Sequence, residues 1–566
     1  MTFGLQATFQ LLGRTENEAA VPLLLAALDS PAPRIQQAAL RAIFERRSPE
    51  GLREVIRRRA SIDDAWKKII QDFPGRFLPA LRDAVLSADP EFAAEGCRVA
   101  KLFREYDLIP TLIVALEDEV NPSRDIAAQT LTDLADELYQ DLAGMREDRR
   151  RRDPQISRRN ATSALEASLQ RFGRHQRLEP VEAFLQLATR DNAELMRILA
   201  DPRASIFTAI LGVLHASERP GVIRLLLGFL DDSRPPSAGL TSLFRRTDRR
   251  TIDNLLKKVG SEPSVVARTN LRQVETIAWI NDHSLLEKLD AAQQHSVVKL
   301  AVLSGMKRAD IIAVLEYFVV HGKPAGRRSA VQSLADFNGA DVNTLVLKAL
   351  RDEDPHAKAH ALGQLRRRGI PGALTTLIES LDSPLRPVSE AARANLEEFS
   401  FRRFLPAFEL LEEDVRRTTG GLVRKVDLTT AAQLREEMES PQGKRRMRAL
   451  KVVMSLDMVP EMQADVIARA GDEDHLVRVE AVRALAMAHS LDALATLQDL
   501  QSDSSFAVRE AVAAALEQFT VAPGSAAEAA SLPPLPGFPF GSSPTMMLGP
   551  ASSPDSQGLA ATGDSP

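Results

Sequence analysis

The chain has 566 residues, of which 44% are hydrophobic and 26% charged, with a formal net charge of −5 and a single cysteine, Cys97. This composition excludes intramolecular disulfides and cysteine-cluster metal sites, and it argues against a polycation built for nucleic acid. No apolar run approaches the roughly 18 residues of a membrane-spanning helix, and no basic segment precedes the first apolar residues. We therefore expect a cytoplasmic protein without membrane insertion.

Turn-forming residues recur from the N-terminal region onward at an interval of about thirty residues. The positions that carry this register are Asp29, Asp89, Asp118, Pro202, Asp232, Glu262, Asp352, Asp382, Asp472 and Asp503. An apolar run of helical character precedes each turn, as in VPLLLAAL before Asp29, and a second run follows it. Asp89-Pro90, Asp201-Pro202, Asp354-Pro355 and Ser383-Pro384 pair a capping side chain with a proline, which predicts helix starts. Each unit is thus predicted to be helix, turn, helix.

The register is lost between Asp118 and Pro202, and residues 145–177 contain ten arginines against four acids. We predict a basic insertion or a degenerate repeat over residues 141–180. A second basic stretch covers residues 234–258. From these two stretches we select candidate partner-binding residues that would receive acidic groups: Arg149, Arg150, Arg151, Arg152, Arg158, Arg159, Arg245, Arg246, Arg249 and Arg250.

The segments DSPAPRIQQAALRAI (29–43), DEDPHAKAHALGQL (352–365), DEDHLVRVEAVRALA (472–486) and DSSFAVREAVAAALEQF (503–519) resemble HEAT repeats of the short bacterial type. The resemblance covers residues 15–520. It implies an all-α superhelix, a solenoid of about 16 to 17 repeats whose second helices line a concave face.

A base often stands six residues after the turn acid. The resemblance implies that these acids and bases form a structural ladder between neighbouring repeats. The ladder residues are Asp118, Arg124, Glu262, Arg268, Asp352, Lys358, Asp472, Arg478, Asp503 and Arg509.

We divide the chain into N-terminal repeats (1–140), the basic segment (141–180), continuing repeats (181–520) and a tail (521–566). The tail is rich in proline, glycine and serine, which predicts disorder. Its PxxP pattern, Pro533–Pro536, suits docking to a polyproline-binding module, but the composition favours a solvated tail.

Motifs for catalysis are missing from the sequence: there is no GxSxG, GxGxxG, GxxxxGK[ST] or HExxH pattern. His356 and His360 are spaced for one helix face, but no acid stands beside them as a general base, so we interpret them as a pair without metal. No histidine is followed by glutamate, which excludes the iron-binding dipeptides of deoxyhypusine hydroxylase. We expect no enzyme activity, metal or cofactor.

The leading functional hypothesis is a non-enzymatic scaffold or adaptor that binds other proteins on the concave surface of the solenoid. The alternative is a nucleic-acid-binding HEAT-like protein, related to those that excise alkylated bases, with arginine clusters on phosphates. Against the alternative, acids balance the bases, and Trp66 and Trp279 are the only tryptophans available for base stacking.

Overall fold

The computed structural model describes residues 3–144, 153–260 and 263–520. These residues form thirty-four α-helices and contain no β-strand. Two helices per repeat would account for about seventeen repeats, so the predicted all-α repeat architecture is confirmed. The chain divides into two compact units, Met1–Glu397 and Glu398–Pro566.

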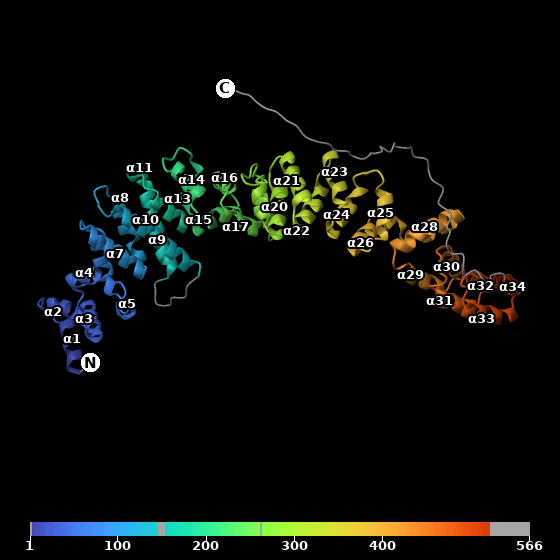
Figure 1. The fold of residues 1–566 in the computed structure, drawn as a ribbon, viewed down its shortest axis with the longest axis horizontal. Helices are drawn as coiled ribbons and strands as arrows, with labels where there is room; N and C mark the ends of the chain where they lie inside the picture. The colour runs from blue at the N-terminus through green and yellow to red at the C-terminus, as the bar shows by residue number, and fades with distance from the viewer. Residues whose placement is uncertain (1–2, 145–152, 261–262, 521–566) are drawn as a thin grey trace, which may run out of the picture. The chain divides into compact units, whose positions relative to one another are not determined.

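The first unit contains twenty-six of the helices (Figure 1). In chain order they are α1 (Phe3–Arg14), α2 (Ala20–Leu28), α3 (Pro33–Arg46), α4 (Pro49–Arg57), α5 (Asp64–Gln71), α6 (Leu78–Val85), α7 (Pro90–Phe103), α8 (Ile109–Glu117), α9 (Arg124–Leu142), α10 (Pro154–Gln170), α11 (Phe172–His175), α12 (Glu179–Leu187), α13 (Ala193–Ala200), α14 (Phe207–Ala216), α15 (Pro220–Phe229), α16 (Ser237–Arg245), α17 (Arg249–Gly260), α18 (Val265–Leu271), α19 (His283–Lys288), α20 (Ala291–Leu303), α21 (Arg308–His321), α22 (Pro324–Ser333), α23 (Ala340–Ala349), α24 (Pro355–Leu365), α25 (Ala373–Leu381) and α26 (Arg386–Ala394).

The second unit contains the remaining helices of the described residues. They are α27 (Phe401–Ala407), α28 (Glu413–Val426), α29 (Thr430–Met438), α30 (Gly443–Ser455), α31 (Gln463–Ala470), α32 (His475–Ala486), α33 (Leu491–Asp499) and α34 (Phe506–Thr520). Among the described residues, no helix combines the length and the apolarity that crossing a membrane requires.

Within each unit the helices stack in two rows, because the first and second helices of a repeat each pack on their counterparts in the next. In the first unit, α20, α22, α24 and α26 follow one another as second helices, and α21 lies beside α23 in the other row (Figure 1). In the second unit, α30, α32 and α34 form the row of second helices, while α31 packs on both α29 and α33. Each repeat therefore buries its apolar face against its neighbours, as a solenoid requires.

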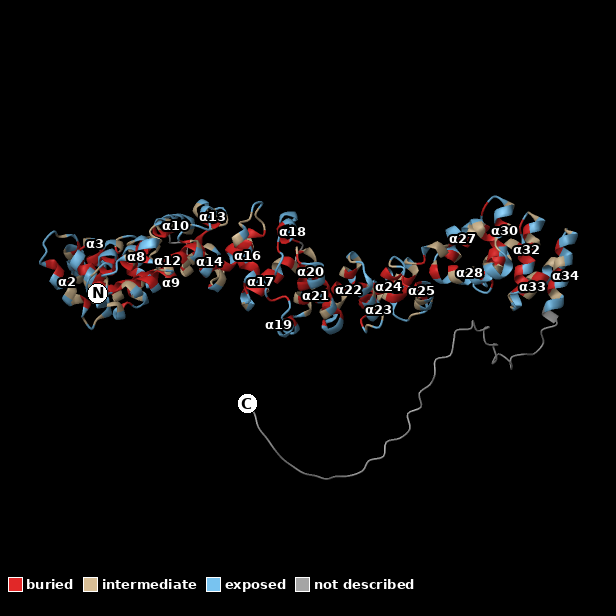
Figure 2. Ribbon diagram, turned by 90° about the horizontal axis from the view of Figure 1, so that it is seen from above, coloured by how far each residue is buried: buried red, intermediate tan, exposed pale blue. Residues whose placement is uncertain are grey.

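Small side chains let these rows pack closely. Ala481 and Ala484 of α32 are completely buried between the helices of the second unit. The phenylalanines Phe401, Phe404 and Phe408, spaced by three and four residues, are also buried there. Figure 2 shows buried residues all along the stacked helices, between exposed outer faces. Thin layers rich in alanine and leucine can be filled with few aromatic side chains, and aromatic residues make up only 5% of the chain.

Two of the four predicted aspartate-proline or serine-proline helix starts are confirmed. Asp89 caps α7 and Asp354 caps α24, each accepting two backbone N–H bonds in the first turn. The other two predictions are wrong: Asp201 ends α13 rather than starting a helix, and Ser383 lies in a turn before α26 begins at Arg386. A capping pair thus marks a turn reliably, but not the first residue of the helix after it.

The described part of the basic segment 141–180 is helical and belongs to the stack. Helix α10 packs against α8, α9 and α12, so it occupies a place between repeats. The boundary at Glu397 was not expected from the sequence, in which residues 181–520 formed one continuous run. The predicted tail, 521–566, lies outside the described residues.

Candidate functional site: arginines in and outside the repeat ladder

A ladder of arginine and aspartate links consecutive repeats of the second unit. The Arg446 guanidinium donates from Nη2 to Oδ1 of Asp472 at 2.7 Å, and both side chains are buried. Arg478, 32 residues after Arg446, pairs with Asp503 through Nε to Oδ2 and Nη2 to Oδ1, both at 2.9 Å. Each arginine also donates to a backbone carbonyl of its own turn: Arg446 to Ser440 at 2.9 Å, Arg478 to Asp472 at 2.8 Å. Each of these arginine side chains therefore binds a backbone carbonyl in the turn of its own repeat and an aspartate in the turn of the next repeat.

The ladder runs from the base of one repeat to the acid of the following repeat. Arg327 of α22 donates from Nε to Oδ2 of Asp352 at 2.9 Å, and its Nη1 donates to the Gly322 carbonyl. The predicted ladder includes Arg478 and Asp503, which do link neighbouring repeats. It missed Arg327 and Arg446, because neither arginine has an acid six residues before it. A search for an arginine 25 or 26 residues before a turn acid would have found both.

The remaining expected ladder residues keep only part of this arrangement. Arg124 donates to the carbonyl of Leu116, Arg268 to that of Pro263 and Arg509 to that of Asp503, at 2.7, 3.0 and 2.6 Å. These three arginines thus bind backbone of their own turns. Asp118 accepts the N–H of Val120, Lys358 is half-buried on α24, and Glu262 lies outside the described residues.

Many other arginines bridge repeats by binding the carbonyl groups at helix ends. Arg246 Nη1 donates to Leu214 and Ser217 at 2.8 and 2.7 Å, Arg76 Nη1 to Phe44 at 3.0 Å and Arg366 Nη1 to Asn395 at 2.8 Å. The last carbonyls of a helix lack partners within it, so a guanidinium from the adjacent repeat satisfies them. A planar group with five donors suits this role better than an ammonium.

The candidate partner-binding arginines are placed unequally. Arg149, Arg150, Arg151 and Arg152 lie outside the described residues. On α10, Arg158 is half-buried and Arg159 exposed, and Arg245 is exposed at the end of α16. Arg249 and Arg250 are exposed on α17, where Arg249 pairs with Asp253 at 2.8 Å and Arg250 Nη1 donates to the Glu218 carbonyl at 3.2 Å.

Arg246 does not meet the expectation for a surface residue. Only 3% of it is exposed, it binds two carbonyls of α14 and the following turn, and it pairs with Asp248 at 2.7 Å. Its guanidinium is used inside the fold, so a partner cannot reach it. We therefore remove Arg246 from the candidate surface.

The turn before α24 contains a carboxyl group, that of Asp354, whose pKa is strongly lowered. Burial opposes ionisation of Asp354, but Arg328 binds both of its oxygens, with Nη2 to Oδ2 at 2.6 Å, and two N–H groups of α24 donate to Oδ1. These bonds to the charged form prevail and lower the pKa of Asp354 to about 2. Asp354 is thus a structural anion that joins α22 to the start of α24.

A serine, a histidine and a glutamate come together between α8, α10 and α11. Ser168 Oγ donates to Glu117 Oε1 at 2.5 Å and lies 3.5 Å from His175 Nε2. However, His175 Nδ1 accepts the Arg177 N–H at 3.0 Å, so the proton is on Nε2, which is 3.2 Å from the Ser168 carbonyl. In this tautomer His175 cannot take the serine proton through Nε2. Ser168 is fully buried, and Arg171 neutralises Glu117 at 2.8 Å, so the cluster holds helices together.

The histidine pair on α24 has no metal-binding surroundings. Burial lowers the pKa of His360, and the nearby His356 and Arg328 act in the same direction. Within residues 3–144, 153–260 and 263–520, no group of three or more histidine, cysteine, aspartate or glutamate side chains is placed to hold a metal ion.

A family profile described as HEAT repeats matches residues 312–397 and 432–535. These two segments of the chain contain HEAT repeats. The matched ranges include most of α21, the helices α22 to α26 of the first unit, and the ladder of Arg446 and Arg478 in the second. No curated protein sequence matches the chain.

Among solved structures, the chain is similar to one from a study of a phosphorylation switch that controls the interaction between cadherin and beta-catenin. The identity is 13%, the match covers 88% of this chain and 99% of that chain, and the TM-score is 0.30. It is similar to human deoxyhypusine hydroxylase with 18% identity, coverage of 53% and 96%, and a TM-score of 0.16. For Kap121p bound to Pho4p the identity is 12% and the TM-score 0.24; 91% of this chain matches 53% of that one. Similarities this weak carry no information on function.

Proposed function

We propose that the chain is a non-enzymatic scaffold that binds other proteins through its stacked repeats. The observation that supports this most is a division among the arginines. One group, which includes Arg246 and Arg478, forms hydrogen bonds and ion pairs between neighbouring repeats. A second group, Arg158 and Arg159 on α10 with Arg249 and Arg250 on α17, is at least partly accessible at the surface. Accessible arginines on a rigid repeat array suit recognition of acidic groups on a protein partner.

The same division among the arginines argues against nucleic-acid binding. Arg57, Arg58 and Arg59 are consecutive in the chain, but they pair with acids, including Asp29 at 3.0 Å from Arg58 and Glu95 at 2.7 Å from Arg59. In the cluster Arg366–Arg368, the side chains donate to backbone carbonyls of neighbouring repeats. Arginines whose charge an acid neutralises, such as Arg58 and Arg59, contribute little to phosphate binding, and the same holds for Arg249, which pairs with Asp253.

The experiment that tests the scaffold is affinity capture from extract of the native cells, with the full-length chain as bait. Two variants neutralise the accessible arginines in separate places: Arg158→Gln with Arg159→Gln, and Arg249→Gln with Arg250→Gln. Arg402→Gln with Arg403→Gln serves as a matched control, since these two arginines are exposed on α27 in the other unit.

We expect one set of proteins that the wild type and the control retain and that at least one of the two test variants loses. Retention by all baits alike would contradict the assignment to these arginines. Capture of duplex DNA alone, with a steep loss on adding salt, would contradict the scaffold itself.

A further inference from the structure

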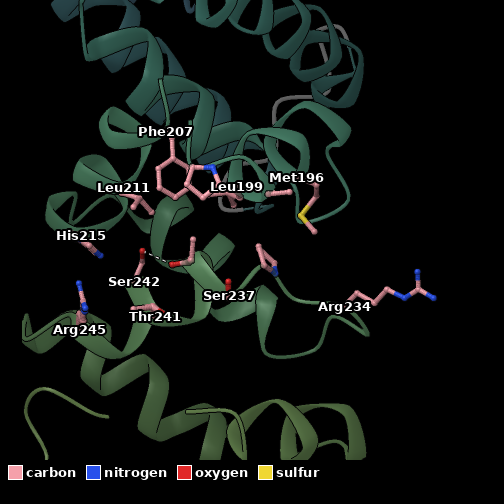
Figure 3. A pocket seen from close by; sticks show the side chains of 14 residues that line it. Met196, Leu199, Phe207, Leu211, His215, Arg234, Ser237, Thr241, Ser242 and Arg245 are labelled. Atoms are coloured by element: carbon pink, nitrogen blue, oxygen red, sulfur yellow. Dashed lines mark hydrogen bonds between the residues drawn. The ribbon is translucent and has the colours of Figure 1, made fainter. Parts of the chain in front are cut away.

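A cavity of about 490 Å³ opens between α13, α14 and α16 in the first unit (Figure 3). Its volume falls in the range of pockets that hold small organic ligands. Met196 and Leu199 come from α13, and Phe207 and Leu211 from α14. These side chains make one wall apolar, and Figure 3 shows them above the residues of α16.

The opposite wall is polar and belongs mainly to α16 and the turn before it. Ser237 and Thr241 are exposed there, while Ser242 is buried and its Oγ donates to the Ala238 carbonyl at 2.8 Å. An apolar wall facing a wall with a few polar groups is the usual pattern of a ligand pocket, in which the polar groups orient the ligand.

Positive charge borders this cavity. Arg234 precedes α16 and Arg245 ends it, both are exposed, and neither makes an ion pair with the residues that the structure describes. Figure 3 shows Arg245 beside His215 at one side of the cavity and Arg234 at the other. The contrast with the neighbouring Arg246, which is buried and paired, indicates that Arg245 is free to bind a ligand.

His215 adds an unsatisfied polar atom to the same side. Its Nε2 is buried and has no hydrogen-bond partner among the described residues. Burial lowers the pKa of His215, and Arg245 and Arg246 lower it further, so the ring is neutral at pH 7. A buried nitrogen without a partner is costly, and Nε2 would gain a partner only if the ring turned so that its N–H donated to an anion oxygen in the cavity.

We propose that this cavity binds a small organic anion: a ligand whose hydrocarbon part packs on Leu199, Phe207 and Leu211 and whose carboxylate pairs with Arg245 beside His215. The chemistry of the two walls selects for both parts at once, since a guanidinium beside an apolar surface favours an anion that is itself partly apolar. This site is separate from the partner-binding surface proposed above and does not depend on it.

The test is isothermal titration calorimetry of the full-length chain with decanoate, which joins an apolar chain to a carboxylate. Decylammonium keeps the chain but reverses the charge, and butyrate keeps the charge but shortens the chain. Two variants change the cavity: Arg245→Gln removes its charge, and Leu211→Asp makes its apolar wall acidic. Arg402→Gln removes an exposed arginine of the second unit and serves as the control.

We expect decanoate to bind at one site, and to bind roughly tenfold or more weakly to Arg245→Gln, because a charge-assisted bond to a guanidinium is lost. Leu211→Asp should abolish binding, with an unchanged circular dichroism spectrum to show that it folds, while Arg402→Gln should bind as the wild type does. Absence of decanoate binding to the wild type would overturn the proposal. So would equal affinities for decanoate and decylammonium, or unchanged decanoate affinity in Arg245→Gln, whose exposed side chain poses no risk to folding.

Discussion

Arg478 and Asp503 are joined by two parallel hydrogen bonds of 2.9 Å, although 25 residues separate them in the chain. Both side chains are about nine-tenths buried. This bidentate geometry fixes the turn before α34 against the second helix of the preceding repeat. It is the most complete rung of the ladder in the second unit, so it offers a direct measure of what a rung contributes to stability.

Replacing Arg478 by Ala should lower the free energy of unfolding of the second unit by about 1–3 kcal/mol, because Asp503 keeps its charge but loses its partner. Thermal melting followed by circular dichroism would report the change. A double-mutant cycle with Asp503→Asn would separate the pair from its surroundings. Arg402→Ala, on an exposed site of the same unit, should melt like the wild type. Unchanged melting of Arg478→Ala would show that the rung is dispensable.

Arg245 and Arg246 form a natural matched pair for a second measurement. Arg246→Ala leaves two carbonyls of the preceding repeat and the Asp248 carboxylate without their partner, and should cost about 3–5 kcal/mol, as breaking a buried ion pair does. Arg245→Ala should leave stability almost unchanged, because its side chain is exposed. Urea unfolding of the two variants would compare them. Similar losses in both would contradict the buried role of Arg246.

Asp354 should make the stability of the first unit depend on pH in acid. Its pKa is about 2 in the folded chain against 3.8 as the ordinary value, so its ionised form stabilises the fold by about 2 kcal/mol above pH 4. Since the folded pKa is the lower one, this stabilisation is lost as the pH falls from about 4 toward 2. The melting temperature difference between the wild type and Asp354→Asn should therefore be large at pH 6 and shrink toward pH 2. A difference independent of pH would rule out the ionised carboxylate as its source.

Gly221 marks a close approach between α15 and α12. A Cβ atom there would lie 2.2 Å from the Gln186 carbonyl oxygen, whereas one on Gly212, within α14, would meet nothing within 4 Å. Gly221→Ala should thus destabilise the first unit by about 1–3 kcal/mol through overpacking. Gly212→Ala should stabilise it by about 0.5–1 kcal/mol, since alanine restricts the unfolded chain and favours a helix. Thermal melting should therefore place Gly212→Ala above the wild type and Gly221→Ala below it. A higher melting temperature for Gly221→Ala than for Gly212→Ala would refute the close contact.

The repeat architecture was predictable because it depends on features that the sequence states locally: a thirty-residue register, apolar helices on both sides of each turn, and capping residues such as Asp89 and Asp354. The roles of individual arginines were not predictable in the same way. Arg245 and Arg246 are adjacent and identical, yet one is exposed and the other buried, because their positions at the end of α16 point them to different surroundings. Ladder partners also lie one repeat apart, so a spacing within one repeat finds Arg478 and Asp503 but misses Arg327 and Arg446, which have no acid six residues before them.

The bonds from arginine to backbone carbonyls have a consequence for how such a chain can change over evolutionary time. A carbonyl is present whatever residue occupies the position, so the bonds from Arg76 to Phe44 and from Arg366 to Asn395 set few demands on the identity of the side chains they reach. One repeat can therefore diverge in sequence without losing its attachment to the next. Repeats attached in this way can lose detectable sequence similarity to one another while they keep the same backbone geometry.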